Sequence, residues 1–330
     1  MLRFSSFALV TLCVSASLAQ AQQPRLLVAV KGEQKLAIVD PATLKVLGKV
    51  DETGFTGHEV AASPDGKFAY VPIYGNSGVG QPGTDGTKIV KIDLATEKIV
   101  GTLDFGRGVR PHCPVFGPKD GLLYVTTELD KAVTAIDPKT LKIAGTIPTG
   151  QEQSHMLTIS HDGRRGYTAN VGPGTVSVLD MKARKLVKVI KISGNTQRIA
   201  ISNNDKWVFT ADQTKPQIAV IDTATDALAK WVPLDGLGYG AALTRDGRSL
   251  LMTVPSKNEI EVVDLQTMTV ARKIATQADP EEVVVTPDGK SAWVSGPASG
   301  SVAEIDLATW KMTKQVKTGG YSDGVAWAGR

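Results

Sequence analysis

The sequence contains very few cysteines. Of its 330 residues only 2 are cysteine; Cys13 lies in an apolar N-terminal segment, and Cys113 stands alone in the remainder. A single thiol cannot form an intrachain disulfide, so the packing of the core must hold the fold together. The motif Cys-x-x-Cys-His is absent, which excludes a covalently attached c-type haem.

Blocks of like charge and long apolar runs are also missing beyond the first 21 residues. The formal net charge is only +4, and the basic residues are scattered along the chain. This distribution makes no strong case for nucleic acid as a partner. No proline-rich linker or low-complexity tract marks a second domain, and no later segment is apolar enough to form a transmembrane helix.

The N-terminus has the features of a secretory leader. A basic start at Arg3 precedes an apolar run over residues 4–18 and the motif Ala19-Gln20-Ala21. This pattern is typical of a signal peptide cleaved after Ala21, and Leu12 before Cys13 does not suit a lipoprotein signal. We therefore expect a signal peptide over residues 1–21, a mature domain over residues 22–330, and a periplasmic or secreted location.

What the chain does contain is a repeat. A short apolar run ends in aspartate seven times, at intervals of 53, 44, 43, 42, 42 and 42 residues. The terminal residues are Asp40, Asp93, Asp137, Asp180, Asp222, Asp264 and Asp306. Repeats of this length and number predict an all-β fold, a seven-bladed β-propeller with four strands in each blade.

Turn motifs divide each repeat into strands. Ser63-Pro64-Asp65-Gly66 is typical of a tight hairpin turn, and related turns recur five more times. Residues 324–327 form an inner strand without a following partner, and residues 26–30, 35–39 and 45–50 supply three outer strands. The sequence thus predicts a ring closed by the N- and C-terminal strands, which share one blade and leave no free sheet edge.

The strands that follow the hairpin turns resemble a known repeat. Leu123-Tyr124-Val125-Thr126-Thr127 and Gly166-Tyr167-Thr168-Ala169-Asn170 are similar to the YVTN repeat. The chain resembles the secreted YVTN-family β-propellers over essentially its whole mature length. This resemblance implies a seven-bladed periplasmic or extracellular propeller. It implies no single reaction, because such folds host binding proteins, lactonases and haem-carrying domains.

Aligning the inner strands on their hairpin turns places one polar residue at each strand entrance. Equivalent positions in a closed ring converge on its axis, so we expect these side chains to line one mouth of the central channel. They are His58, His112, His155, Arg198, Tyr239, Glu281 and Asp323. We refer to these seven residues as the channel ring. The alternative is that a wet channel mouth tolerates any polar residue.

Three of the four histidines in the sequence fall in the channel ring. Adjacent imidazoles at His58, His112 and His155 are candidate ligands for a divalent transition metal or for an anionic substrate. The fourth, His161, lies in a hairpin turn that we expect to be exposed at the opposite face. The leading prediction is therefore a protein that binds a small ligand, a metal ion or a periplasmic partner protein at the histidine-bearing mouth.

The other half of the ring suggests a hydrolase as an alternative. Glu281 or Asp323 can serve as a general base, and Arg198 can hold a carboxylate or stabilise an oxyanion. The constellation is similar to that of lactonase-type propellers, which makes His155, Arg198 and Glu281 the catalytic candidates. Arg198 can equally pair with a channel carboxylate and keep the mouth closed. A third possibility is a protein-interaction scaffold; a closed ring predicts a monomer.

Three further features concern the same mouth. The glycine-rich segment over residues 74–86 is much longer than the equivalent connections, and we expect it to cover the histidine side as a lid. Glu128, Asn170 and Asp212 come from the corresponding connections and are expected at the rim. Cys113 and Met156 follow ring histidines directly, and strand alternation predicts that their sulfurs point between the blades.

Overall fold

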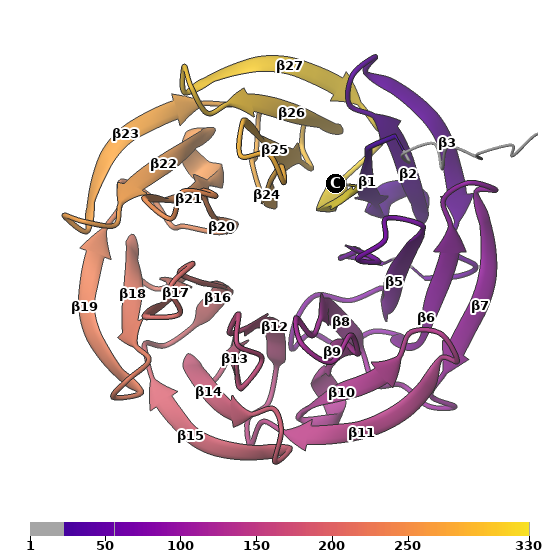
Figure 1. Cartoon of the computed structure of the whole chain (residues 1–330), viewed down its shortest axis with the longest axis horizontal. Coiled ribbons are helices and arrows are strands. Elements are labelled where there is room, and N and C mark those ends of the chain that lie inside the picture. The colour runs from indigo at the N-terminus through magenta and orange to yellow at the C-terminus, as the bar shows by residue number, and fades with distance from the viewer. Residues whose placement is uncertain (1–22, 56, 330) are drawn as a thin grey trace, which may run out of the picture.

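The computed structural model describes residues 23–55 and 57–329, and within them the chain forms seven four-stranded antiparallel sheets. The sheets are arranged as blades around a central hole (Figure 1). The predicted seven-bladed β-propeller is confirmed. The expected signal peptide over residues 1–21 lies outside the described residues. No helix of the described part is long and apolar enough to cross a membrane.

Six blades follow one another along the chain. Blade 1 contains β4 (Ala61–Ala62), β5 (Phe68–Gly75), β6 (Asp85–Asp93) and β7 (Lys98–Asp104). Blade 2 contains β8 (Pro111–Phe116), β9 (Leu123–Thr127), β10 (Ala132–Asp137) and β11 (Lys142–Pro148). Blade 3 contains β12 (Ser154–Ile159), β13 (Arg165–Asn170), β14 (Thr175–Asp180) and β15 (Lys185–Lys191).

The second half of the ring repeats the pattern. Blade 4 contains β16 (Thr196–Ile201), β17 (Trp207–Asp212), β18 (Gln217–Asp222) and β19 (Ala227–Pro233). Blade 5 contains β20 (Ala241–Leu243), β21 (Ser249–Val254), β22 (Glu259–Asp264) and β23 (Thr269–Ala275). Blade 6 contains β24 (Val283–Val285), β25 (Ser291–Gly296), β26 (Ser301–Asp306) and β27 (Lys311–Lys317). Three short 3-10 helices lie in the connections: η1 (Lys31–Glu33), η2 (Glu128–Asp130) and η3 (Pro255–Lys257).

The seventh blade is built from both ends of the chain, as the sequence predicts. The C-terminal strand β28 (Ser322–Ala328) is its inner strand, and β1 (Arg25–Val30), β2 (Lys35–Asp40) and β3 (Lys45–Asp51) complete it. In Figure 1 the C-terminal end lies next to β1. Antiparallel pairing of β1 with β28 therefore closes the ring.

The recurring aspartate is explained by the turn that it caps. In each blade its Oδ1 accepts hydrogen bonds from backbone amides two or three residues later, as Asp40 does from Ala42 and Thr43. The residue four positions after the aspartate has a left-handed backbone in every blade, as Leu44 does with a φ of 60°. The repeat in the sequence thus encodes the turn between the third and fourth strands.

The core lies between neighbouring blades. The middle strands are mostly buried and the inner strands β4 and β20 are half-buried, whereas the outer strands β3, β7 and β11 are half-exposed. Trp293 is fully buried, Trp327 is partly buried against the same interblade cluster, and Trp207 is partly buried against another. Each blade packs its two faces against the neighbouring blades. This circular packing places the first residues of the inner strands near the axis.

Candidate functional site

Four of the seven residues in the channel ring lie at register shifts at the entrances of the inner strands. His155 in β12 and Arg198 in β16 are extra residues that break the pairing register with the next strand. A related shift occurs at His112 in β8 and at Asp323 in β28. A bulge lets consecutive side chains turn toward the same side, so simple alternation does not hold here.

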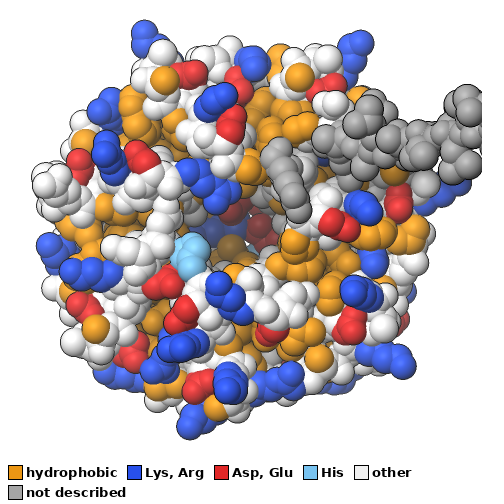
Figure 2. Space-filling view, viewed as in Figure 1, with side chains coloured by type: hydrophobic (Ala, Val, Ile, Leu, Met, Phe, Trp, Pro, Cys, Tyr) orange, Lys and Arg blue, Asp and Glu red, His pale blue; other side chains and the backbone are white. Residues whose placement is uncertain are grey.

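All seven side chains of the channel ring line one cavity of about 220 Å³. The remaining lining residues are Lys31, Glu59, Gly78, Val79, Gln197 and Tyr321. Figure 2 shows the centre of the ring from one face, with basic and acidic side chains deep in the central hollow. The register argument therefore brings together residues that are up to 265 positions apart, from His58 to Asp323.

The three ring histidines are buried against Tyr74. The rings of His112 and His155 are stacked, with centroids 3.5 Å apart, and His58 meets His112 edge to face at 5.6 Å. Burial lowers the pKa of His58 and His112 well below its usual value and also lowers that of His155. All three imidazoles are therefore neutral at pH 7.

These imidazoles carry buried nitrogens without hydrogen-bond partners in the described part of the chain. The atoms are His58 Nε2, His112 Nδ1 and His155 Nδ1. Glu128 Oε2 approaches His155 Nδ1 to 3.6 Å, which is too long for a hydrogen bond. Buried polar atoms of this kind are rare in proteins and indicate a missing binding partner or water.

The histidines do not converge as metal ligands. Across residues 23–55 and 57–329, one group of three side chains places its ligand atoms within 4.8 Å of one another, and it is Asp235, Glu259 and Glu261. Stacking of His112 on His155 brings ring faces together rather than nitrogens. A metal ion at the ring would require the imidazoles to rotate.

Arg198 forms the centre of the acidic half. Its Nη1 pairs with Glu59 and lies 2.6 Å from Glu282 Oε2, and its guanidinium lies 4.9 Å from the Tyr239 ring centroid. Asp323 is more distant, at 3.9 Å from Nη2. Burial raises the pKa of Glu59 to about 8, although the attraction of Arg198 opposes this shift. Arg198 thus pairs with channel carboxylates, which is the alternative to a catalytic role that the sequence analysis gave for this residue.

The carboxyl group of Asp323 lies close enough to Glu281 to influence its ionisation. Burial, followed by the charge of Asp323, raises the pKa of Glu281 to about 8. Glu281 therefore retains its proton near neutral pH. Such a pair can both take up and release a proton.

Sequence reasoning missed two carboxylates at the axis, Glu59 and Glu282. Each directly follows a ring residue, and strand alternation assigns both to the space between the blades. Because the strand entrances are irregular, both reach Arg198 instead. The signal that could have identified them is charge: a buried interblade position does not tolerate an unpaired carboxylate.

The long connection over residues 74–86 lies at the histidine side, as expected. Gly78 and Val79 line the cavity directly. Arg110 holds the loop, because its Nε donates to Asp85 Oδ1 at 2.6 Å and its Nη2 donates to the Gln81 carbonyl at 2.8 Å. We call residues 74–86 the lid.

The expected rim residues behave differently from one another. Glu128 is buried below the histidines, where its Oε2 accepts a hydrogen bond of 2.6 Å from the Tyr74 hydroxyl. Asn170 and Asp212 do not reach the rim, because their side chains are buried in hydrogen bonds within their own blades, to Ser177 and Gln217 among others. The expectation that these two residues line the mouth is wrong.

The two sulfur atoms that follow ring histidines lie in the interblade core. Cys113 and Met156 belong to the same buried cluster, and burial raises the pKa of the Cys113 thiol to about 12. Cys113 is therefore an unreactive thiol. Met156 also contacts the site, since its Sδ lies 3.5 Å from Arg198 Nη1, which alternation alone did not predict.

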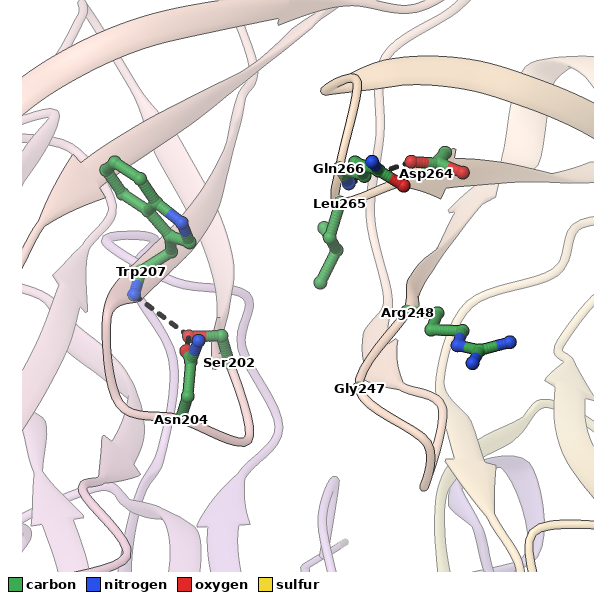
Figure 3. A pocket seen from close by; sticks show the side chains of 8 residues that line it. All are labelled: Ser202, Asn204, Trp207, Gly247, Arg248, Asp264, Leu265 and Gln266. Carbon is green, nitrogen blue, oxygen red and sulfur yellow. Dashed lines mark hydrogen bonds between the residues drawn. The ribbon is translucent and has the colours of Figure 1, made fainter.

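A larger hollow lacks converging chemistry. Figure 3 shows a pocket of about 470 Å³ between two blades, where the polar side chains of Ser202 and Asp264 accept hydrogen bonds from nearby turn amides. In this view Arg248 extends away from Trp207. His161 is exposed and lies 2.6 Å from Asp205. The cavity at the channel ring therefore remains the best candidate site.

Comparisons with known proteins agree with the fold. Residues 117–249, less than half of the chain, match the family model described as the cytochrome D1 haem domain. No curated protein matches the chain. Among solved structures, the chain is similar to Kuenenia stuttgartiensis hydrazine synthase, with a TM-score of 0.74 and 19% identity over 91% of this chain and 99% of that one.

Two further structures are similar over 92% of this chain. One is the dihydro-haem d1 dehydrogenase NirN in complex with DHE, with a TM-score of 0.64, 18% identity and 66% of that chain covered. The other is the Pseudomonas aeruginosa periplasmic gluconolactonase PpgL, with a TM-score of 0.72, 15% identity and 99% of that chain covered. At these identities the likeness concerns the fold alone.

The family model raises the question of a haem. Pockets for ligands of drug size span about 300–1,000 Å³ and are mainly apolar, and a tetrapyrrole needs a large one. The cavity at the channel ring has about 220 Å³ and is lined by Lys31, Glu59, Arg198 and other polar groups. A haem does not fit this cavity. What the chain shares with these proteins is the β-propeller fold.

Proposed function

We propose that this protein binds a small, uncharged, hydroxyl-bearing solute in the cavity at the channel ring. The observation that carries the proposal is the set of buried histidine nitrogens without partners at His58, His112 and His155. Neutral imidazole offers one donor and one acceptor on each ring. Hydroxyl groups, which also donate and accept, complement such rings better than an ion does.

The distribution of charge supports a neutral ligand. Arg198 pairs with the carboxyl groups of Glu59 and Glu282, whose pKa values burial raises, and Lys31 lies 3.7 Å from Asp323. Since the charged groups already have partners, an ionic ligand would have to disrupt a pair in a buried environment, which is costly. A polar neutral molecule leaves these pairs intact.

The size and cover of the cavity support a small ligand. About 220 Å³ is room for roughly seven waters at about 30 Å³ each, which suits a molecule of monosaccharide size. Gly78 and Val79 of the lid close one side. Exclusion of water by the lid strengthens each hydrogen bond inside.

A ligand panel tests this proposal. We expect D-glucono-1,5-lactone or a neutral monosaccharide to raise the melting temperature of the purified protein, and gluconate to have less effect. The variant His112→Phe keeps an aromatic ring in the stack but removes both nitrogens, so it should lose the response. The matched control is His161→Phe, at the exposed histidine. A panel without any binder, or binding retained in His112→Phe, would contradict the proposal.

A hydrolase of the lactonase type is the second candidate, because of the Glu281–Asp323 pair. A carboxyl pair that holds one proton can accept a proton from water as it adds to a lactone carbonyl, and can return one to the ring oxygen as the C–O bond breaks. The fold likeness to the gluconolactonase is compatible with this reaction. We expect Glu281→Gln to lower lactone turnover by about 10²–10⁴-fold, measured by pH-stat titration, and unchanged turnover would remove this candidate.

The cellular setting is also proposed. The leader over residues 1–21 and the YVTN-like strands support a propeller exported to the periplasm or the medium. N-terminal sequencing of protein recovered from the periplasm should begin at Gln22. A retained N-terminus in the cytoplasm would contradict export.

A further inference from the structure

A second cluster of polar groups lies away from the channel ring, between blades 4 and 5. Asp235 follows β19 of blade 4, and Glu259 and Glu261 stand on β22 of blade 5 (Figure 1). One ligand atom from each of these three carboxylates lies within 4.8 Å of the other two. Glu259 and Glu261 share one face of the sheet because they are two positions apart.

Glu261 is the unusual member of this cluster. Its side chain is fully buried, its Oε1 accepts a hydrogen bond of 2.9 Å from the Asp235 amide, and its Oε2 has no partner among the described residues. A buried carboxylate oxygen without a partner is costly. It therefore points to a ligand between the three carboxylates.

Comparison of the blades shows that the fold does not require this carboxylate. The residue three positions before the terminal aspartate is small or apolar in the other six blades. These residues are Ala37, Val90, Thr134, Ser177, Ala219 and Ala303. A fully buried glutamate at a position that alanine fills elsewhere indicates a role specific to blade 5.

Lysine compensates the negative charge only in part. Lys273 Nζ pairs with Asp235 Oδ2 and lies 3.7 Å from Glu259 Oε1. Lys257 attracts Asp235 without forming an ion pair that reaches Glu261. The Lys273 side chain is partly exposed, and Glu261 Oε2 is left without a donor among the described residues.

We propose that Asp235, Glu259 and Glu261 bind a calcium ion. Calcium takes oxygen ligands at about 2.3–2.6 Å, so two ligand atoms on opposite sides of one ion are about 5 Å apart, as the cluster permits. Water and backbone carbonyls complete such sites. The ion replaces Lys273 as the partner of Asp235 and gives Glu261 Oε2 its missing partner.

The position of the site links it to the channel ring. Asp235 begins the connection between blades 4 and 5, and four residues later this connection carries Tyr239 to the cavity. An ion held by both blades would fix this connection. Calcium therefore orders one wall of the cavity without entering it.

Isothermal titration calorimetry on chelator-treated protein tests the proposal, with calcium chloride varied from about 10 μM to 10 mM. We expect one calcium ion per chain, with a Kd of about 10⁻⁴–10⁻³ M, as in extracellular modules. Glu261→Gln retains the acceptor for the Asp235 amide and should weaken calcium binding more than about tenfold. Lys273→Met removes the competing ammonium and should bind calcium several-fold more tightly.

The matched control is Glu304→Gln, which removes a carboxylate from the central strand β26 of blade 6, where it pairs with Lys314 at 2.9 Å. This variant should bind calcium as the unmodified protein does. The proposal is overturned if the unmodified protein binds no calcium in this range, if Glu261→Gln binds it equally well, or if magnesium binds more tightly than calcium. Because the site does not share residues with the channel ring, these results do not depend on the solute proposal.

Discussion

At the scale of single residues, the channel mouth depends on side chains in costly environments. Arg198 has a left-handed backbone with φ 53° and a fully enclosed guanidinium. A non-glycine residue in this region costs on the order of 1 kcal/mol. The bulge imposes this conformation and turns Arg198 toward Glu59 and Glu282. The ion pairs formed there offset the conformational cost of the bulge.

Glu52 gives a test of buried charge near this mouth. Its Oε2 accepts a hydrogen bond of 2.7 Å from the amide of Gly57, directly before His58, and its Oε1 has no partner in the described part of the structure. Burial raises the pKa of Glu52 from 4.5 to about 8. The folded state thus holds this proton more tightly than the unfolded chain does.

We therefore predict that Glu52 lowers stability as the pH rises. Its contribution to the free energy of unfolding is retained below about pH 4.5 and is lost progressively up to about pH 8, a change of a few kcal/mol at about 1.4 kcal/mol per pKa unit. Urea unfolding from pH 5 to pH 8 should show a shallower decline for Glu52→Gln than for the unmodified protein. Parallel profiles for the two proteins would contradict this assignment.

At the scale of structural elements, the lid is the least regular part of the mouth. It joins β5 to β6 and rests on the histidine side, where Arg110 connects it to blade 2. Arg110 also lies 3.5 Å from Glu128, whose other oxygen accepts from Tyr74 at the base of the lid. One arginine therefore couples the lid to the wall that holds His155.

Substitution of Arg110 by lysine should loosen the lid. Lysine cannot reproduce the two directed hydrogen bonds to Asp85 and Gln81, and loss of a charge-assisted hydrogen bond costs about 1.5–3 kcal/mol. We expect amide exchange over residues 76–84 to accelerate tenfold or more, with exchange in β16–β19 unchanged. Arg107→Lys is the control, because Arg107 pairs with Asp130 at the exposed surface; equal effects of both variants would argue against the lid contact.

At the scale of the whole molecule, ring closure makes the two chain ends a single element. β28 pairs with β1 from Arg25↔Ala328 to Val30↔Ser322, and Val325 and Ala328 are buried in it. Asp323, at the start of the same strand, lines the cavity. Stability and site therefore share the C-terminal strand.

Deletion of residues 322–330 should destabilise the entire propeller. It exposes an edge of β1 and removes the core contacts of Val325, Trp327 and Ala328, a loss on the order of 5 kcal/mol. Scanning calorimetry should show a melting temperature lower by at least about 10 °C, or no folded protein. Deletion of residues 329–330 alone leaves β28 complete and should change little; an unaltered melting temperature in the longer deletion would contradict closure by β28.

The sequence alone predicts the architecture, because each turn is formed by residues that are neighbours in the sequence. The recurring aspartates cap their own turns, and Ser63-Pro64-Asp65-Gly66 closes its own hairpin, so their spacing reports the blades. The channel ring was also predictable, since equivalent positions in a circular repeat meet at the axis. The cluster of Asp235, Glu259 and Glu261 could not be predicted in this way, because its residues come from two different blades and meet only when these blades pack together.

Tertiary structure decided where side chains point at the irregular positions. Alternation predicts the direction of a side chain only while the pairing register continues, and the bulges at His155 and Arg198 interrupt it. Glu59 and Glu282 precede the first paired residues of β4 and β24, where no strand pairing fixes the alternation, and both reach Arg198. Asn170 and Asp212, in contrast, turn into their own blades. The periodic pattern of the sequence determines the ring of blades, but the packing of strand entrances against one another determines the charges and hydrogen bonds inside it.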